Sequence, residues 1–371
     1  MLNALKRMDK KFLIFVGLII GLPIVLILFL VIMRGCGNSK MTYQEYEQKM
    51  ISTTEKYLTL TKKIPTNEGE TVTVKLSELI NGEYIKSTEK SLDDITCDGE
   101  VLVRRNGASV EATKGGYLNY IVDLKCKDYS TTHLVDKLKE NVVSTDSGLY
   151  LDGNKYVFKG DKVNNYISLS GLIYRIVSID ENNILKLVRA EAEPINRLWD
   201  NKYNVETGKI SGKNIYKDSD ILEYLLYDYN NLKKMNENTK KIVMAYDACI
   251  GKRDETNYTI DENLDCSEKL EKQVISLLNV SDYVKASLDP DCKDLKSRSC
   301  NNYNYLYNVA SSTWTLNVSA NNSYNVFTIS DGLIEPQIAN TTYVYNVVIY
   351  MDGNQLYTSG SGTELEPYIY D

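Results

Sequence analysis

Residues 172–188 have the sequence LIYRIVSIDENNILKLV, in which two apolar runs flank four polar residues. The runs at 172–179 and 184–188 are rich in Ile, Val and Leu, and 180–183 (DENN) has the composition of a turn. Apolar runs of this length on either side of such a turn are typical of a β-hairpin. The stretch therefore predicts a pair of antiparallel strands.

Strands and helices are both expected around this hairpin. The polar segment 131–146 lacks periodicity, so we take it as a linker and place a large α+β domain at 147–371. The other elements expected in that domain are strands at 155–158, 166–169, 324–329 and 344–351, and helices at 220–229 and 267–278.

A smaller domain is expected at 41–130. Thr42 and Glu45 have the spacing of a capping box, and an apolar stripe at helical spacing then continues to Ile64, before Pro65 ends the helix. A strand at 71–76, a short helix at 77–82 and strands at 100–104 and 118–125 are expected after it.

Cys97 precedes the first strand of the expected 100–125 hairpin, and Cys126 follows the second. If the strands pair antiparallel, both residues lie at the open end of the hairpin, within bridging distance. A disulfide there closes a loop of about 30 residues and contributes a few kcal/mol to stability. The alternative is two free buried thiols.

The order of helix, strand, short helix and disulfide-closed hairpin over 41–126 resembles the periplasmic part of type IV pilins and pseudopilins. The pilin processing signature, a Gly followed by Phe and by a Glu five residues into the apolar helix, is absent. We therefore expect a pilin-like domain that does not polymerise into a pilus.

Several motifs of the large domain occur in a fixed order: LIYRIVSI at 172–179, LKLV at 185–188, LNVSDY at 278–283, NNYNYL at 301–306, WTL at 314–316 and GSGTELEPYI at 360–369. On these motifs the domain resembles bacterial surface domains related to C-type-lectin-like and sulfatase-modifying-factor folds. The resemblance implies a twisted antiparallel sheet, two flanking helices and long irregular loops. Tyr174 stands where the family often has Trp, and Tyr345-Asn346 where it has Arg-Pro; at these core-like positions we expect local repacking.

Four cysteines of the large domain allow three disulfide pairings by sequence alone. Short loops together with the resemblance favour Cys249–Cys266 and Cys292–Cys300. The rival is a zinc site made of all four thiolates, but such sites use closely paired cysteines that these spacings lack.

The candidate ligand-binding residues are aromatic or acidic. Tyr303, Tyr305 and Tyr307, with Trp314, form a candidate recognition surface, although alternating tyrosines equally fit one buried strand face. Asp289, Asp291 and Asp294 are candidate calcium ligands, because calcium prefers oxygen ligands; the alternative is a solvated acidic loop held by a disulfide.

No catalytic motif is present, and the single histidine, His133, lies in the expected linker. A linker does not readily hold a histidine beside the Ser or Cys that it would activate, so we expect His133 to be a solvated linker residue. Paired carboxylates remain an alternative as the basis of a glycosidase. We expect a binding protein rather than an enzyme, and no resident cofactor other than the candidate calcium.

Residues 12–33 have the sequence FLIFVGLIIGLPIVLILFLVIM, which carries no charge. As a helix this run is about 33 Å long, enough to cross a bilayer. Lys6, Arg7, Lys10 and Lys11 precede the run and only Arg34 directly follows it, which predicts a cytoplasmic tail at 1–11 and an extracellular body. A cleaved signal, or a lipoprotein signal ending at Cys36, is the alternative.

The body is acidic. The chain carries −7, of which residues 1–11 contribute +3 and Arg34 +1, so residues 35–371 carry −11. This charge argues against nucleic acid or anionic lipid as partners of the body. The sequence thus predicts a single-pass, membrane-anchored bacterial surface protein that presents a C-type-lectin-like module to a glycan or protein. The alternatives are a component of a pseudopilin-like assembly and an extracellular hydrolase.

Overall fold

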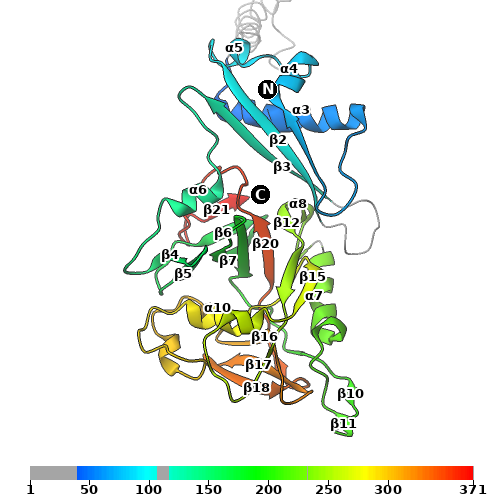
Figure 1. Ribbon diagram of the computed structural model, residues 1–371, viewed down its shortest axis with the longest axis vertical. Helices are drawn as coiled ribbons and strands as arrows, with labels where there is room; N and C mark the ends of the chain where they lie inside the picture. The colour runs from blue at the N-terminus through cyan, green and yellow to red at the C-terminus, as the bar shows by residue number, and fades with distance from the viewer. Residues whose placement is uncertain (1–39, 107–116, 232, 371) are drawn as a thin grey trace, which may run out of the picture.

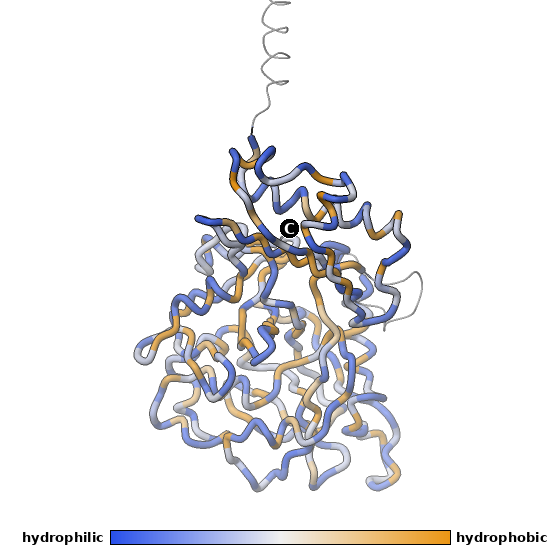
Figure 2. Tube along the Cα trace, turned by 45° about the horizontal axis from the view of Figure 1, so that its top comes forward, coloured by the Kyte–Doolittle hydropathy of each residue, from blue (hydrophilic) through white to orange (hydrophobic). Residues whose placement is uncertain are grey.

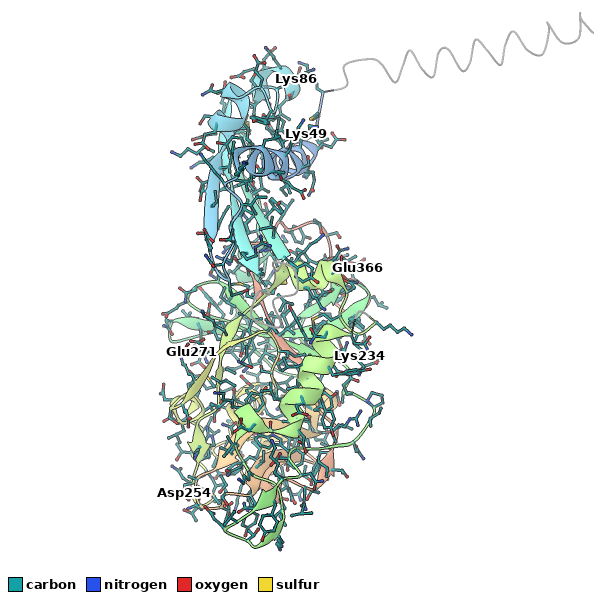
Figure 3. The ribbon with its side chains drawn as sticks, turned by 90° about the vertical axis from the view of Figure 1, so that its right-hand side faces the viewer. Lys49, Lys86, Lys234, Asp254, Glu271 and Glu366 are labelled. Carbon is teal, nitrogen blue, oxygen red and sulfur yellow. A yellow bond between two sulfur atoms is a disulfide. The ribbon has the colours of Figure 1, made fainter. Side chains whose placement is uncertain are left out.

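The computed structural model describes residues 40–106, 117–231 and 233–370. It is an α+β protein with two hydrophobic cores, a smaller one between Tyr46 and Leu124 and a larger one between Leu134 and Tyr368. Figure 1 shows the part built on the smaller core at one end of the long axis and the larger part below it. Figure 3 shows the same division from the side, with Lys49 and Lys86 in the smaller part and Lys234 and Asp254 in the larger one. We call these the small part and the body.

The small part consists of helix α3 (Tyr43–Thr61) packed on the antiparallel sheet β1-β2-β3. The predicted capping box is confirmed: Glu45 N donates to Thr42 Oγ1 at 3.2 Å, and Thr42 N donates to the Glu45 carboxylate at 2.7 Å. The helix ends before Ile64, because Lys62 takes a left-handed conformation. The other elements are β1 (Thr71–Lys75), α4 (Leu76–Asn81), α5 (Thr88–Ser91), β2 (Cys97–Asn106) and β3 (Tyr117–Cys126).

All three expected disulfides are present. Strands β2 and β3 pair antiparallel with Cys97 opposite Cys126, which brings the two Cα atoms to 4.2 Å. In the body, disulfides join Cys249 to Cys266 and Cys292 to Cys300. The predicted pairings are therefore confirmed, and the four cysteines of the body are not zinc ligands.

The predicted hairpin at 172–188 is confirmed as β7 (Leu172–Ile179) and β8 (Ile184–Arg189). In its turn, the Asp180 carboxylate accepts hydrogen bonds from the backbone N–H groups of Asn182 and Ile184, at 2.9 and 2.8 Å. Asn183 completes the turn in a left-handed conformation, which Asn tolerates better than most residues. Every residue of β8 is buried, as expected for a central strand.

The hairpin is the middle of an eight-stranded sheet with the order β12-β20-β8-β7-β5-β4. Strand β6 also pairs with β7, and β21 pairs with β6 in parallel. The bounds of the remaining strands are β4 (Gly148–Asp152), β5 (Lys155–Lys159), β6 (Tyr166–Leu169), β12 (Val243–Met244), β20 (Val348–Asp352) and β21 (Tyr368–Tyr370).

A second, four-stranded sheet, β14-β16-β17-β18, forms the far end of the body. Its strand β16 carries Trp314, and both tryptophans of the chain, Trp199 and Trp314, are fully buried in the large core. The strands outside the main sheet are β9 (Arg197–Leu198), β10 (Tyr203–Asn204), β11 (Lys209–Ile210), β13 (Tyr246–Cys249), β14 (Lys252–Arg253), β15 (Lys269–Gln273), β16 (Ser312–Ser319), β17 (Asn325–Ser330), β18 (Leu333–Ile338) and β19 (Thr342–Tyr343). The helices are α6 (Leu134–Lys139), η1 (Tyr216–Asp218), α7 (Asp220–Asn230), α8 (Glu237–Ile242), α9 (Glu262–Asp265), α10 (Val280–Lys285), η2 (Arg298–Asn301) and α11 (Tyr307–Ala310).

Two expectations for the body need correction. The predicted helix at 267–278 is wrong: 269–273 form strand β15, which pairs with β13, and the buried residues that follow are extended up to α10. The disulfide at Cys266 sets this pairing by holding the chain beside Cys249. The strand predicted at 344–351 begins later, at Val348. Tyr174, Tyr345 and Asn346 are buried, as expected of core-like positions.

The segment 131–146 contains helix α6. Its Leu134, Val135 and Leu138 are buried in the large core, so the segment packs on the body rather than running free between the two parts. Beside it, an ion pair of 2.5 Å joins Arg104 of β2 to Asp352 of β20. The small part is therefore tied to the body by charge as well as by the chain.

The predicted tail at 1–11 and anchor at 12–33, with Cys36, lie outside the described residues. In the segments that the structure describes, no helix is both long enough and apolar enough to cross a membrane. Figure 2 shows hydrophobic residues along the strands in the middle of the body and hydrophilic residues on its outer loops.

Candidate functional site

A cleft of about 520 Å³ opens beside α6, where this helix meets the β4–β5 hairpin and the segment 357–368. Its floor is apolar: Leu138 of α6, Leu149 of β4 and Phe158 of β5 are almost fully buried members of the large core. Ligand pockets in proteins are commonly concave, apolar at the base and about 300–1,000 Å³ in volume. The cleft has this form.

One wall of the cleft is the closing segment that carries the GSGTELEPYI motif. The rings of Tyr357 and Tyr368 meet edge to face at 6.2 Å, and the Tyr357 hydroxyl donates to the Gly360 carbonyl at 2.8 Å. Gly360 (φ 100°) lies so close to the Pro367 carbonyl that a side chain would clash with it. Burial raises the pKa of Tyr368 to about 12, so its hydroxyl stays protonated at neutral pH. The wall is thus a fixed pair of aromatic rings.

Polar side chains surround the mouth of the cleft. Lys137 and Asn141 come from α6 and the residues after it, and Lys162 and Asn164 come from the segment after β5. A hydrogen bond from Lys137 to Glu140, 2.6 Å long, holds the pKa of Lys137 above its usual value. Lys162 and Asn164 are both exposed. Glu140 balances the charge of Lys137, so the mouth offers the positive charge of Lys162 and the amide groups of Asn141 and Asn164 to a ligand.

These groups are suited to recognition of a ligand. Tyrosine rings stack on flat apolar faces, amides form directed hydrogen bonds, and ammonium groups attract carboxylate or sulfate. None of the side chains that line the cleft, all within the described ranges, is an Asp or Glu. The pair of carboxylates that a glycosidase uses is therefore not found in the cleft lining.

The aromatic residues expected to bind a ligand do not share a surface. Tyr305 and Trp314 are buried, Tyr307 is half-buried and Tyr303 is exposed. Tyr305 lies against the guanidinium of Arg175, 4.8 Å from ring centre to Cζ, and this stacking is part of the core. The segment 303–307 is a turn leading into α11, so neither a recognition surface nor a strand face describes it.

The expected calcium ligands do not converge either. Asp289 accepts hydrogen bonds from the backbone of Asp291 and the side chain of Asn302, and Asp294 accepts from the backbone of Lys296. These two carboxylates thus stabilise local structure, and the carboxylate of Asp291 pairs with Lys293 at 3.2 Å. Across 40–106, 117–231 and 233–370, no group of three or more His, Cys, Asp or Glu side chains is placed to hold a metal ion. The expectation of calcium at these residues is not met.

His133 is less exposed than a linker residue was expected to be. Its side chain is 16% exposed, and Nε2 lies 3.1 Å from the carbonyl oxygen of Val122 in β3. Nδ1 lies 3.5 Å from the Asp136 carboxylate. His133 therefore helps to join the body to the small part and does not line the cleft.

A second, smaller cavity of about 120 Å³ lies beside the Cys249–Cys266 disulfide. Charged pairs line it: Lys186 contacts Asp282 at 2.5 Å, and Lys155 contacts Glu262. The negative charge of Asp282 keeps Lys186 protonated and its pKa above the usual value, although burial acts in the opposite direction. Since each of these lysines is paired with a carboxylate, we regard the residues as a structural network.

The sequence did not reveal the cleft. Its lining comes from 137–164 and 357–368, which are distant in the chain, and no local motif joins them. One signal was present: Leu134, Val135 and Leu138 have the spacing of one helix face, which places Lys137 and Asn141 on or next to a helix.

Comparison with known proteins does not assign a family. The chain matches no family model, no curated protein and no solved structure. What it does is therefore inferred from the cleft and from the arrangement of the two parts.

Proposed function

We propose that this chain is an extracellular binding protein that takes a glycan or a polypeptide segment in the cleft beside α6. The cleft carries the proposal: an apolar floor, two fixed tyrosine rings and a mouth with lysine and amide groups match the needs of such a ligand. The three disulfides are consistent with an extracellular or periplasmic location, where disulfides persist.

The proposal includes the expected anchor at 12–33, which would hold the body at the cell surface. The described chain starts at Lys40, beside the small part, so the small part would lie next to the membrane and the body beyond it. The likeness of the body to C-type-lectin-like domains, proposed from its motifs, agrees with a role in recognition.

A second candidate is a structural role in an extracellular assembly. The helix on an antiparallel sheet in the small part favours it, because this is the arrangement that the pilin-like resemblance implies. Under this alternative the small part binds copies of itself or a partner, and the cleft has no ligand.

The test uses the full chain in lipid nanodiscs, screened against an array of glycans, mucins and peptides, with calcium and with chelator. K162A/N164A changes two exposed residues at the mouth of the cleft, and K233A/N238A changes the same residue types on another exposed surface. Selective binding that K162A/N164A abolishes and K233A/N238A retains is the expected result. Because Asp289, Asp291 and Asp294 do not converge, removal of calcium by the chelator should leave ligand binding unchanged.

Two results would count against the cleft. Binding that both double variants retain places the ligand elsewhere. Absence of binding by chain shown to be folded, together with association that increases with concentration, favours the assembly role.

A further inference from the structure

Residues 201–217, which we call the finger, form a narrow hairpin at one end of the body. Strands β10 and β11 pair only with each other, Tyr203 opposite Ile210 and Asn204 opposite Lys209. Figure 1 shows the finger projecting from the end opposite to α5. Lys40, where the described chain begins, pairs with Asp93 just after α5. The finger is thus at the pole farthest from the start of the described chain.

Three polar residues of the finger are buried. Asn204, Ser211 and Asn214 are 2%, 1% and 6% exposed. The Asn204 amide donates to the Gly212 carbonyl at 3.2 Å, and the Asn214 amide donates to the carbonyl of Ser319 at 2.8 Å. The base of the hairpin is therefore held rigidly on the body.

Four apolar residues of the finger face water, whereas Tyr216 at its base is buried in the large core. Tyr203, Val205, Ile210 and Ile215 are 56%, 78%, 59% and 49% exposed. Tyr203 and Ile210 lie opposite each other in the β10–β11 pair, and a set of exposed apolar side chains on one hairpin marks an interaction site. Since the base is fixed, the hairpin cannot turn these side chains inward.

The finger is also basic, in contrast to the rest of the body. Residues 201–217 contain four lysines and one glutamate, a net charge of +3, whereas the other residues of 35–371 carry −14. Lys202 lies 3.6 Å from the Asp200 carboxylate, and Lys209 and Lys217 extend into solvent. The net charge of residues 35–371 argues against anionic lipid as a partner, but the finger presents the opposite charge at the far end of the body.

We propose that the finger inserts its apolar side chains into an anionic lipid bilayer. Aliphatic and tyrosine side chains flanked by lysines match the boundary between acyl chains and anionic headgroups. A bilayer surrounds a narrow hairpin on every side. A stable protein partner, in contrast, needs about 800 Å² on each surface, and β10 and β11 contribute only two residue pairs. If the proposed anchoring holds, this bilayer is that of a second cell or vesicle, because the anchored membrane lies at the other pole.

The test measures capture of vesicles by the full chain held in phosphatidylcholine nanodiscs. Flotation is compared between vesicles that contain phosphatidylglycerol and vesicles of phosphatidylcholine alone. V205S/I210S changes two exposed side chains of the finger, and L151S/L365S changes two exposed leucines elsewhere on the body. We expect capture by the anionic vesicles, about tenfold weaker partitioning for V205S/I210S, and no change for L151S/L365S. K209Q/K217Q should reduce the preference for anionic vesicles.

Failure to capture vesicles, or equal capture by the wild type and V205S/I210S, overturns the proposal. Loss of array binding in V205S/I210S with vesicle capture unchanged would instead make the finger a protein or glycan contact, and also overturns it. K162A/N164A should capture vesicles normally, so failure of the cleft as a binding site and failure of the finger are distinguished.

Discussion

The Arg253–Asp265 ion pair allows a quantitative test of how the body is held together. The Arg253 guanidinium is fully buried, and its Nε donates to the Asp265 carboxylate at 2.5 Å. Its Nη1 and Nη2 donate to the carbonyls of Thr259 and Asp261, at 3.0 and 2.7 Å. One side chain therefore ties β14 to the segment 259–265. We consider its replacement by Met, which keeps similar length without charge or donors.

The expected loss follows from what Arg253→Met leaves behind. Asp265 keeps hydrogen bonds from Asn317 at 2.7 Å and from Ser281, but its buried charge loses its cationic partner. Removal of one member of a buried ion pair costs about 3–5 kcal/mol. Two carbonyls also lose their donors, and each buried unsatisfied group adds about 1–3 kcal/mol when no water replaces the donor. We expect the free energy of unfolding of the body to fall by at least about 3 kcal/mol.

Urea unfolding of the disulfide-intact chain, followed by tryptophan fluorescence, measures this loss. Both tryptophans lie in the large core, so the signal reports on the body and not on the small part. R253M/D265L removes both charges and should be less destabilised than R253M, because no unpaired charge remains. K293M, which breaks an ion pair with both side chains more than 70% exposed, is the control. If R253M is no less stable than K293M, the reasoning is refuted.

Three further changes test the small part and its junction. C97S/C126S opens the loop closed by that disulfide and should lower the stability of the small part by about 2–4 kcal/mol, measured by thermal unfolding with circular dichroism. Burial raises the pKa of Glu47, so the folded protein keeps this proton to a higher pH than the unfolded chain. The free energy of unfolding should therefore fall as the pH rises above 4.5. E47Q should remove that fall in denaturation series at several pH values. R104A leaves the carboxylate of Asp352 without its cationic partner, and limited proteolysis should then cut between the two parts sooner than in the wild type.

Where neighbours in sequence are also neighbours in space, the sequence predicted the structure well. The β7–β8 hairpin is an example, since its turn residues and both of its strands are contiguous. The capping box at Thr42 and Glu45 is another, because both partners lie within one helical turn. Cys97–Cys126 was predicted because the two residues flank one hairpin, and Cys249–Cys266 and Cys292–Cys300 were predicted from short loops together with the family resemblance.

Contacts between residues far apart in the sequence explain the features that the sequence did not predict. Residues 267–278 have an apolar pattern that fits a helix, but pairing of β15 with β13 makes their first half a strand. A short apolar run does not by itself distinguish a buried helix from a buried strand. The cleft and the Arg253–Asp265 pair depend on the same kind of contact, in which partners from separate elements meet only once the chain has folded. The finger was missed for another reason: exposure of apolar side chains is visible only in three dimensions.

The position of β20 governs the order in which the chain can fold. This strand lies between β12 and β8 in the main sheet, yet it is more than a hundred residues beyond both in sequence. As the chain is synthesised, the small part can close first, while β8 keeps an open edge until residues 348–352 emerge. Open edges pair readily with other chains, and contacts of such long range form slowly. A cell that makes this protein must therefore shield β8 throughout synthesis of the intervening chain, and truncation before Val348 would leave that edge permanently available for aggregation.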